Sequence, residues 1–264
     1  MTVYTRRDFM RISMAGIAGA GIINTTAHSA DTFTFAAIND PHIKDAASVA
    51  LLAEAVTAIN ATPEVQFTCL LGDIATDGKA DELTITKAAL DKLVNPYFVV
   101  PGNHDVALRM PDIFANYKAA FGPVHWKHEA GGWTFIGFNS CEGVRSDVTV
   151  SSEELAWLQK CLKTIDPKQP LSLFCHHPLN PNTKAYRIQN ADEILRLFSG
   201  HNLKIAAAGH WHGNQMEEQD GVLFVTTACC ASTRGNFDKS PEKGFRLFNV
   251  QDGVVETEFV VVSA

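Results

Sequence analysis

The stretch Val100-Pro101-Gly102-Asn103-His104-Asp105 ends the apolar run Tyr97–Val100 with a group of polar side chains. Four other stretches have the same form, an apolar run that ends in carboxylate or imidazole residues: Asp40-Pro41-His42, Gly72-Asp73, His176-His177-Pro178 and Gly209-His210-Trp211-His212. Loops that follow parallel strands project into one crevice at the carboxyl edge of a sheet. We therefore expect these stretches to meet and to form a site that can bind metal ions.

Runs with strand character and segments with helical spacing alternate along much of the chain. The segments Val49–Ile59 and Leu155–Leu162 carry apolar residues at steps of three and four. Ser151 with Glu154 forms a capping box, and Asn190 is a candidate start of another helix. The expected strands are Phe33–Ile38, Phe67–Leu71, Tyr97–Val100, Thr134–Phe138, Leu171–Cys175, Lys204–Ala208, Val222–Thr227, Phe245–Val250 and Val254–Val262.

This order of elements decides the fold class. Strands that alternate with helices predict parallel pairing, whereas the strand-rich last third predicts antiparallel pairing. We expect an α/β (α+β) fold, a four-layer αββα sandwich of two mixed β-sheets flanked by helices. The irregular stretches 106–111, 180–187 and 231–243 are expected to form the rim of a pocket.

The spacing within the polar stretches suits metal binding. One residue separates Asp40 from His42, so in extended backbone both side chains point the same way and can hold one ion; His210 and His212 repeat this spacing. Glycines at 72, 102 and 209 closely precede candidate ligands, as expected where backbone turns tightly beside a site. A single such motif is weak evidence, but the ordered set is specific.

The ordered set resembles that of the calcineurin-like metallophosphoesterases, and it is most similar to the subgroup that contains bacterial class III cyclic-nucleotide phosphodiesterases. The resemblance extends from Phe33 to Val262. It implies that Asp73 bridges two metal ions, one of them held by Asp40, His42 and His212, the other by Asn103, His176 and His210.

The resemblance also implies catalytic residues. His104 would act from outside the ligand shell, protonating the leaving oxygen or stabilising the phosphoryl oxygens, with Asp105 orienting its ring. His176 is preferred to His177 as the ligand because it ends the strand and matches the family's histidine, and His177 then has a supporting or packing role.

The donor types limit the metal. Carboxylate, amide and imidazole donors suit Mn, Fe or Zn, and the proposed set contains no thiolate. Two divalent ions would activate water as hydroxide and stabilise in-line displacement at phosphorus. Purple acid phosphatases of the wider superfamily place a tyrosine ligand where this chain has Thr76, so a tyrosinate-bound ferric site is not expected.

The N-terminus resembles a twin-arginine export signal. Thr5-Arg6-Arg7-Asp8-Phe9-Met10 precedes the weakly apolar run Ile12–Ile23, and Ala27-His28-Ser29-Ala30 supplies small residues for cleavage. We therefore expect a signal peptide over residues 1–30, a catalytic domain over residues 31–264, and a periplasmic or secreted product that engages the twin-arginine translocation machinery. Twelve apolar residues are too few to span a bilayer, so no stable membrane insertion is expected.

Charge and cysteine usage narrow the possible partners. Without residues 1–30, 19 basic and 28 acidic residues remain, a net charge of −9, which argues against a nucleic-acid partner. Arg234, Arg187 and Lys184 lie in the expected rim and are candidates for holding substrate phosphate, although solvated surface charge is the simpler reading.

The six cysteines lack C-x-x-C spacing, and we expect mostly free thiols; the role of Cys229 and Cys230 stays open.

The expected function is hydrolysis of small phosphodiesters or phosphomonoesters, with 3′,5′-cyclic nucleotides among the candidates. Two alternatives are a metal-dependent protein that binds phosphate ligands without turnover and a nuclease of the same fold. A peptidase is not expected, because neither His-Glu-x-x-His nor a Ser-His-Asp arrangement is evident.

Overall fold

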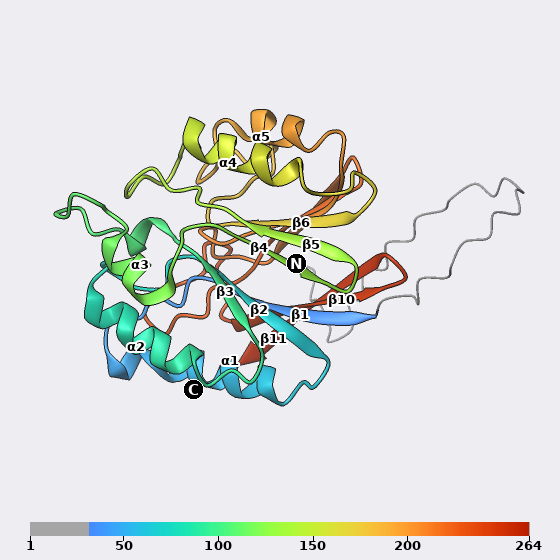
Figure 1. Ribbon diagram of the computed structural model, residues 1–264. Coiled ribbons are helices and arrows are strands. Elements are labelled where there is room, and N and C mark those ends of the chain that lie inside the picture. Colours follow the sequence, from blue (N-terminus) through green and yellow to red (C-terminus); the bar gives the residue numbers. More distant parts are fainter. Residues whose placement is uncertain (1–31, 264) are drawn as a thin grey trace, which may run out of the picture.

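Two β-sheets pack face to face between two layers of helices (Figure 1). The structure, a computed structural model, describes residues 32–263. The predicted αββα sandwich is confirmed. The expected signal peptide lies outside the described residues and stays a prediction.

The first sheet has the strand order β11-β10-β1-β2-β3. Its parallel part is formed by β1 (Phe33–Ile38), β2 (Val65–Leu71) and β3 (Tyr97–Val100), which end at the same edge. The antiparallel part is formed by β10 (Lys243–Gln251), which pairs with β1, and β11 (Val254–Val262), which pairs with β10. The sheet is therefore mixed, as predicted.

The second sheet has the order β4-β5-β6-β7-β9-β8. Four central strands run parallel: β5 (Trp133–Gly137), β6 (Pro170–Cys175), β7 (Asn202–Ala208) and β9 (Val222–Thr226). Antiparallel strands close both edges, β4 (Trp126–Ala130) beside β5 and β8 (Gln215–Gln219) beside β9.

Each layer boundary has its own hydrophobic core. Phenylalanines fill the space between the sheets, where the ring of Phe35 stacks on Phe67 at 5.1 Å and on Phe248 at 4.6 Å between centroids. The outer face of the first sheet is covered by α1 (Ala50–Asn60), α2 (Ala80–Leu90) and α3 (Ala115–Phe121). The outer face of the second is covered by α4 (Ser152–Leu162) and α5 (Ala191–Leu197).

The capping prediction for α4 is confirmed in part. Ser151 accepts a hydrogen bond from the Glu154 amide at 3.2 Å, as an N-cap should. The Glu154 carboxylate, however, accepts from the Asn139 amide at 3.0 Å and does not reach back to Ser151. Glu154 therefore ties the start of α4 to the loop after β5.

Two α-helices and two strands were not expected: α2, α3, β4 and β8. The inner face of α2 includes Glu82 and Thr86, which interrupt its apolar periodicity, and Thr86 bonds the Glu82 carbonyl at 2.9 Å. Edge strand β8, with the sequence QMEEQ, is mostly exposed and lacks the alternation of a half-buried strand. Sheet pairing, not local pattern, makes it a strand.

Two further findings concern the described residues. No helix among them is long and apolar enough to cross a membrane. All six cysteines are free, which confirms the expectation for the thiols.

Candidate metal centre

The five predicted stretches converge. Strands β1, β2 and β3 of the first sheet and β6 and β7 of the second end at one edge of the sandwich, and the polar residues follow directly after them. Backbone and side-chain hydrogen bonds connect these loops: the His42 amide donates to the Asp73 carbonyl at 2.9 Å, and the His210 amide donates to both carboxylate oxygens of Asp40 at 3.1 Å. The second of these contacts joins the two sheets at the site.

The backbone of this region differs from the expectation. Asp40, His42, Asp73 and His210 have φ values of 48°, 45°, 50° and 63°, in the left-handed region. The idea that extended backbone aims Asp40 and His42 the same way is therefore wrong. Left-handed backbone costs about 1–2 kcal/mol for each L-residue, and such strain clusters where function requires an abrupt turn.

Glycines make the close approach of these loops possible, as predicted. Gly72 has a φ of 87°, and a Cβ at this position would overlap the His176 ring. A Cβ on Gly102 would overlap the backbone and carboxylate of Asp73. Neither position has room for a side chain, because each lies against a predicted ligand.

The first group of predicted ligands consists of Asp40, His42, Asp73 and His212, all buried. Nε2 of His42 lies 3.4 Å from Asp73 Oδ2 and 3.3 Å from Nε2 of His212. His212 Nε2 lies 3.5 Å from Asp40 Oδ1. Donor atoms bound to one ion at roughly 2.0–2.2 Å are separated by about this distance.

The second group is built around His176. Its Nε2 lies 3.0 Å from Asn103 Oδ1, 3.1 Å from His210 Nδ1 and 3.3 Å from Asp73 Oδ1. Asp73 thus turns one oxygen toward each group, a position from which its carboxylate could be shared by two ions. All seven predicted ligands are brought together.

The imidazoles are oriented for a cation. A carbonyl can only accept, so each ring nitrogen that faces one is a donor, and in the neutral ring the other nitrogen turns a lone pair into the site. Three rings show this arrangement: His176 Nδ1 to Leu71 O at 2.8 Å, His210 Nε2 to Ser146 O at 3.1 Å and His212 Nδ1 to Gly235 O at 3.1 Å. Metal-binding histidines are commonly fixed in this way, so the donor set fits divalent ions.

The pKa values show the same demand for positive charge. Burial acts to raise the pKa of Asp73, but the charge and hydrogen bond of His176 outweigh burial and hold the pKa well below its usual range. Burial acts to lower the pKa of His176, but the charge of Asp73 outweighs burial and raises this pKa to about 9. Burial also acts to lower the pKa of His212, but the charge of Asp40 raises that pKa to about 11. Burial lowers the pKa of His42 and of His210 to about 4, so both are neutral donors at pH 7.

His177 has other partners. Its Nε2 donates to the Arg145 carbonyl at 3.1 Å, and its Nδ1 lies 3.0 Å from Ser140 Oγ. His177 is grouped with His176 and His210 by distance, but both of its ring nitrogens are engaged by the protein. This favours His176 as the ligand, as predicted.

His104 lies beside the first group, half-buried, with its ring centroid 4.9 Å from that of His42. The expected role of Asp105 in orienting this ring is wrong, because His104 Nδ1 donates instead to the Thr76 carbonyl at 2.7 Å. The buried Asp105 carboxylate accepts from the amides of Ala75 at 2.8 Å and Gly102 at 2.7 Å. Asp105 thus holds together the loops after β2 and β3.

Three aromatic residues that were not predicted as part of the site stand beside the ligands: Tyr186, Trp211 and Phe237. Tyr186 and Phe237 lie in two of the three expected rim loops. Of the rim cations, Arg187 reaches the Pro181 carbonyl at 3.5 Å, and the carbonyl of Arg234 accepts from Lys243 at 2.7 Å. Neither contact joins the Arg187 or the Arg234 side chain to a predicted metal ligand.

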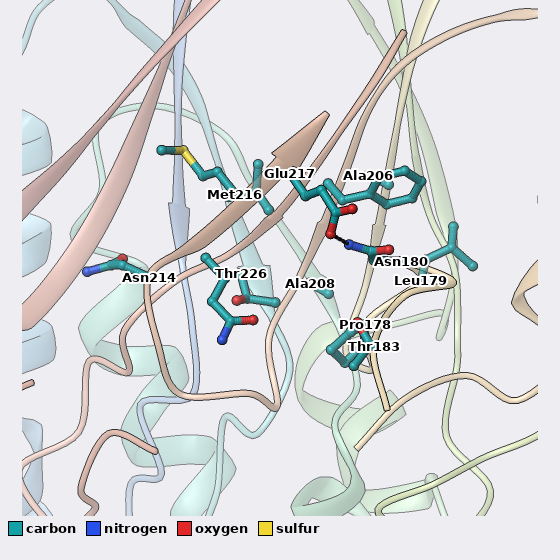
Figure 2. A pocket seen from close by; sticks show the side chains of 13 residues that line it. Pro178, Leu179, Asn180, Thr183, Ala206, Ala208, Asn214, Met216, Glu217 and Thr226 are labelled. Atoms are coloured by element: carbon teal, nitrogen blue, oxygen red, sulfur yellow. Dashed lines mark hydrogen bonds between the residues drawn. The ribbon is translucent and has the colours of Figure 1, made fainter. Parts of the chain in front are cut away.

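A separate pocket of about 370 Å³ lies on the outer face of the second sheet (Figure 2). Ala206 and Ala208 of β7 and Glu217 of β8 line it, and Asn180 bonds Glu217 at 2.8 Å across its wall. Its lining contains none of the predicted ligands.

Two proteins that are named as phosphodiesterases are similar to this chain. A protein of Fibrobacter succinogenes named as a probable cyclic nucleotide phosphodiesterase is 26% identical over 203 residues, which are 72% of this chain and 77% of that protein. A probable glycerophosphodiester phosphodiesterase of Arcobacter nitrofigilis is 30% identical over 184 residues, 64% of each chain.

Solved structures share the fold. Purple acid phosphatase from yellow lupin superposes with a TM-score of 0.66 at 13% identity, covering 89% of this chain and 53% of the lupin protein. In this chain the Thr76 hydroxyl donates a hydrogen bond to the His42 carbonyl at 2.8 Å.

The family match covers most of the described chain and includes every predicted ligand. Residues 33–214 match the calcineurin-like phosphoesterase family. Members use divalent metals, and the His and Asp groups described above can bind them. The chain belongs to the calcineurin-like phosphoesterase family and is a metal-dependent hydrolase of phosphoric esters.

Proposed function

We propose that the protein hydrolyses small phosphodiesters at a pair of divalent ions, Mn, Fe or Zn, that share Asp73. The observation that carries the proposal is the division of the Asp73 carboxylate: Oδ1 faces His176 and Oδ2 faces His42. Asp40 and His212 complete the first site, and Asn103 and His210 complete the second. Such a pair of ions supplies activated water and positive charge for the phosphoryl oxygens.

His104 is proposed as the proton donor to the leaving oxygen. Its Nδ1 donates to the Thr76 carbonyl, so Nε2 is the nitrogen left for substrate, and the ring that is protonated at both nitrogens would give its Nε2 proton to the leaving oxygen. Its amide donates to Asp73 Oδ1 at 2.9 Å, which fixes the residue beside the bridging carboxylate. A positioned proton donor of this kind contributes about 10²–10⁴-fold to rate.

The names of the relatives support diesters as substrates. One relative is named as a probable cyclic nucleotide phosphodiesterase and another as a probable glycerophosphodiester phosphodiesterase. We propose that 3′,5′-cyclic nucleotides are among the diesters that this chain cleaves.

The test is hydrolysis by the protein lacking residues 1–30. It is assayed with Mn, Fe and Zn against 3′,5′-cyclic AMP, glycerophosphoethanolamine, and p-nitrophenyl diester and monoester, while bound metal is counted by elemental analysis. We expect two ions per chain and turnover of at least one diester. Two bound ions with none of the esters cleaved would favour a protein that binds phosphate ligands without turnover.

We also propose that the protein is exported through the twin-arginine pathway to the periplasm or beyond. The support is the motif Thr5-Arg6-Arg7-Asp8-Phe9-Met10 ahead of a weakly apolar run. Replacing Arg6 and Arg7 together by lysine should leave the protein in the cytoplasmic fraction. Unchanged export of this variant would contradict the proposal.

A further inference from the structure

An aromatic wall, defined as Tyr186, Trp211 and Phe237, stands beside both groups of predicted ligands. The ring of Phe237 stacks on His212 of the first group, with centroids 5.0 Å apart and an interplanar angle of 9°. The ring of Tyr186 lies 5.5 Å from His210 of the second group. The wall therefore borders both groups of predicted ligands.

The wall is assembled from three separate loops. Tyr186 follows β6, Trp211 follows β7 and Phe237 follows β9. The ring centroids lie 5.7 Å apart for Tyr186 and Trp211, 5.2 Å for Trp211 and Phe237, and 5.4 Å for Tyr186 and Phe237. These are normal distances for aromatic packing, so the three loops hold one another in place at the site.

Core packing does not account for the wall. None of its three rings belongs to the three hydrophobic cores of the described chain. The Phe237 side chain is 45% exposed, which leaves aromatic surface open to solvent. Tyr186 has a φ of 59°, a left-handed conformation that is strained for a bulky residue.

An exposed aromatic surface beside a phosphate site suits one class of ligand. Planar rings stack on aromatic side chains, and for nucleobases each stack contributes about 1–3 kcal/mol. A glycerol group has no such face. The wall can therefore distinguish two diesters that present the same phosphate to the same ligands.

We propose that the aromatic wall selects phosphodiesters whose ester group carries a planar aromatic ring, such as a nucleobase, over diesters with an aliphatic group, such as glycerol. This inference rests on the proposed diesterase function and adds the specificity-determining residues Tyr186 and Phe237. Both side chains act through contact with the substrate and take no part in bond cleavage.

The test compares two substrates on one protein. With Mn²⁺, kcat/KM is measured for 3′,5′-cyclic AMP and for glycerophosphoethanolamine, in the wild type and in Phe237→Leu and Tyr186→Leu. We expect each substitution to lower the ratio of the first kcat/KM to the second about tenfold, the loss of one stacking contact. Phe237→Trp should retain the ratio, because it keeps an aromatic face.

Tyr97→Leu is the matched control. Tyr97 is also half-buried, but it starts β3 at the opposite end of that strand from the ligands and bonds Asp91. This substitution should leave the ratio unchanged. Circular dichroism and thermal melting show that each variant is folded.

A binding measurement separates this inference from the proposed function. Calorimetric titration with 5′-AMP and with glycerol 3-phosphate should show weaker 5′-AMP binding in Phe237→Leu, with a much smaller change for glycerol 3-phosphate. If none of the diesters is cleaved, including the p-nitrophenyl diester, the proposed function fails and this titration still decides the role of the wall. If Phe237→Leu lowers the affinity for both ligands and kcat/KM for both substrates by the same factor, the wall does not select for an aromatic ring.

Discussion

Asp73 divides its carboxylate between two histidines: Oδ1 lies 3.3 Å from His176 Nε2, and Oδ2 lies 3.4 Å from His42 Nε2. The two histidines follow strands of different sheets, so one side chain connects donors that the fold brings from both halves of the sandwich. A substitution of Asp73 would therefore disturb both groups of predicted metal ligands at once.

Asp73→Asn should therefore weaken both sites together. The amide keeps the shape but removes a charge and replaces one acceptor oxygen by a donor. We expect fewer than two bound ions and a fall in kcat/KM of about 10²–10³-fold, since charge stabilisation by metal is worth several kcal/mol. Elemental analysis and diester hydrolysis measure the two effects. Asp77→Asn, at an exposed residue of the same loop that pairs with Lys79, is the control. Two tightly bound ions in Asp73→Asn would contradict a bridging role.

His104→Ala should lower turnover without removing metal. His104 contacts Asp73 through its backbone amide, which the substitution retains, and its ring bonds Thr76. We expect kcat to fall about 10²–10⁴-fold, the usual contribution of a general acid. A diester with a good leaving group, such as p-nitrophenolate, should be affected less because its oxygen needs no proton. Equal losses for good and poor leaving groups would exclude the proton-donor role.

Much of this site follows from the sequence because it depends on strand ends. The apolar runs before Asp40, Asp73, Asn103, His176 and His210 each form the predicted strand, and parallel pairing places their ends at one edge. The left-handed backbone was not predicted, because φ at a non-glycine residue depends on the packing around it. For the same reason the partner of His104 was misassigned to Asp105.

The aromatic wall shows a different limit. Tyr186, Trp211 and Phe237 lie in irregular loops without periodicity, so no local pattern indicates that they meet. The edge strands β4 and β8 are equally dependent on distant partners, since pairing with β5 and β9 makes them strands. Packing between irregular loops cannot be predicted from a local sequence pattern, whereas the ends of strands can be located where an apolar run stops.

Gly72→Ala should destabilise the protein and disturb His176. The new Cβ would overlap the imidazole, and the φ of 87° disfavours any L-residue. Overpacking of about 1–3 kcal/mol and left-handed backbone of about 1–2 kcal/mol predict a loss of about 2–5 kcal/mol in the free energy of unfolding. For a chain of this size that lowers Tm by roughly 4–20 °C.

Gly253→Ala is the control for this substitution. Gly253 has a φ of 76°, but no neighbouring atom lies within 4 Å of the point that an added Cβ would occupy. It should show only the backbone cost and normal metal content. If both variants lose the same stability and retain both ions, crowding against His176 is not significant.

Metal binding should release protons at pH 7. Asp73 raises the pKa of His176 to about 9 and Asp40 raises that of His212 to about 11, so below pH 9 both rings are protonated at both nitrogens. A metal ion must displace the proton on the nitrogen that faces the site. His42 and His210, with pKa values of about 4, are already neutral. Binding should therefore release about two protons from these rings between pH 6 and 8, and metal affinity should fall as pH falls.

Calorimetric titration with Mn²⁺ in buffers of different ionisation enthalpy counts the protons. His128→Ala, a substitution in β4, should give the same count, and release of fewer than one proton at pH 7 would show that the carboxylates do not hold these histidines protonated.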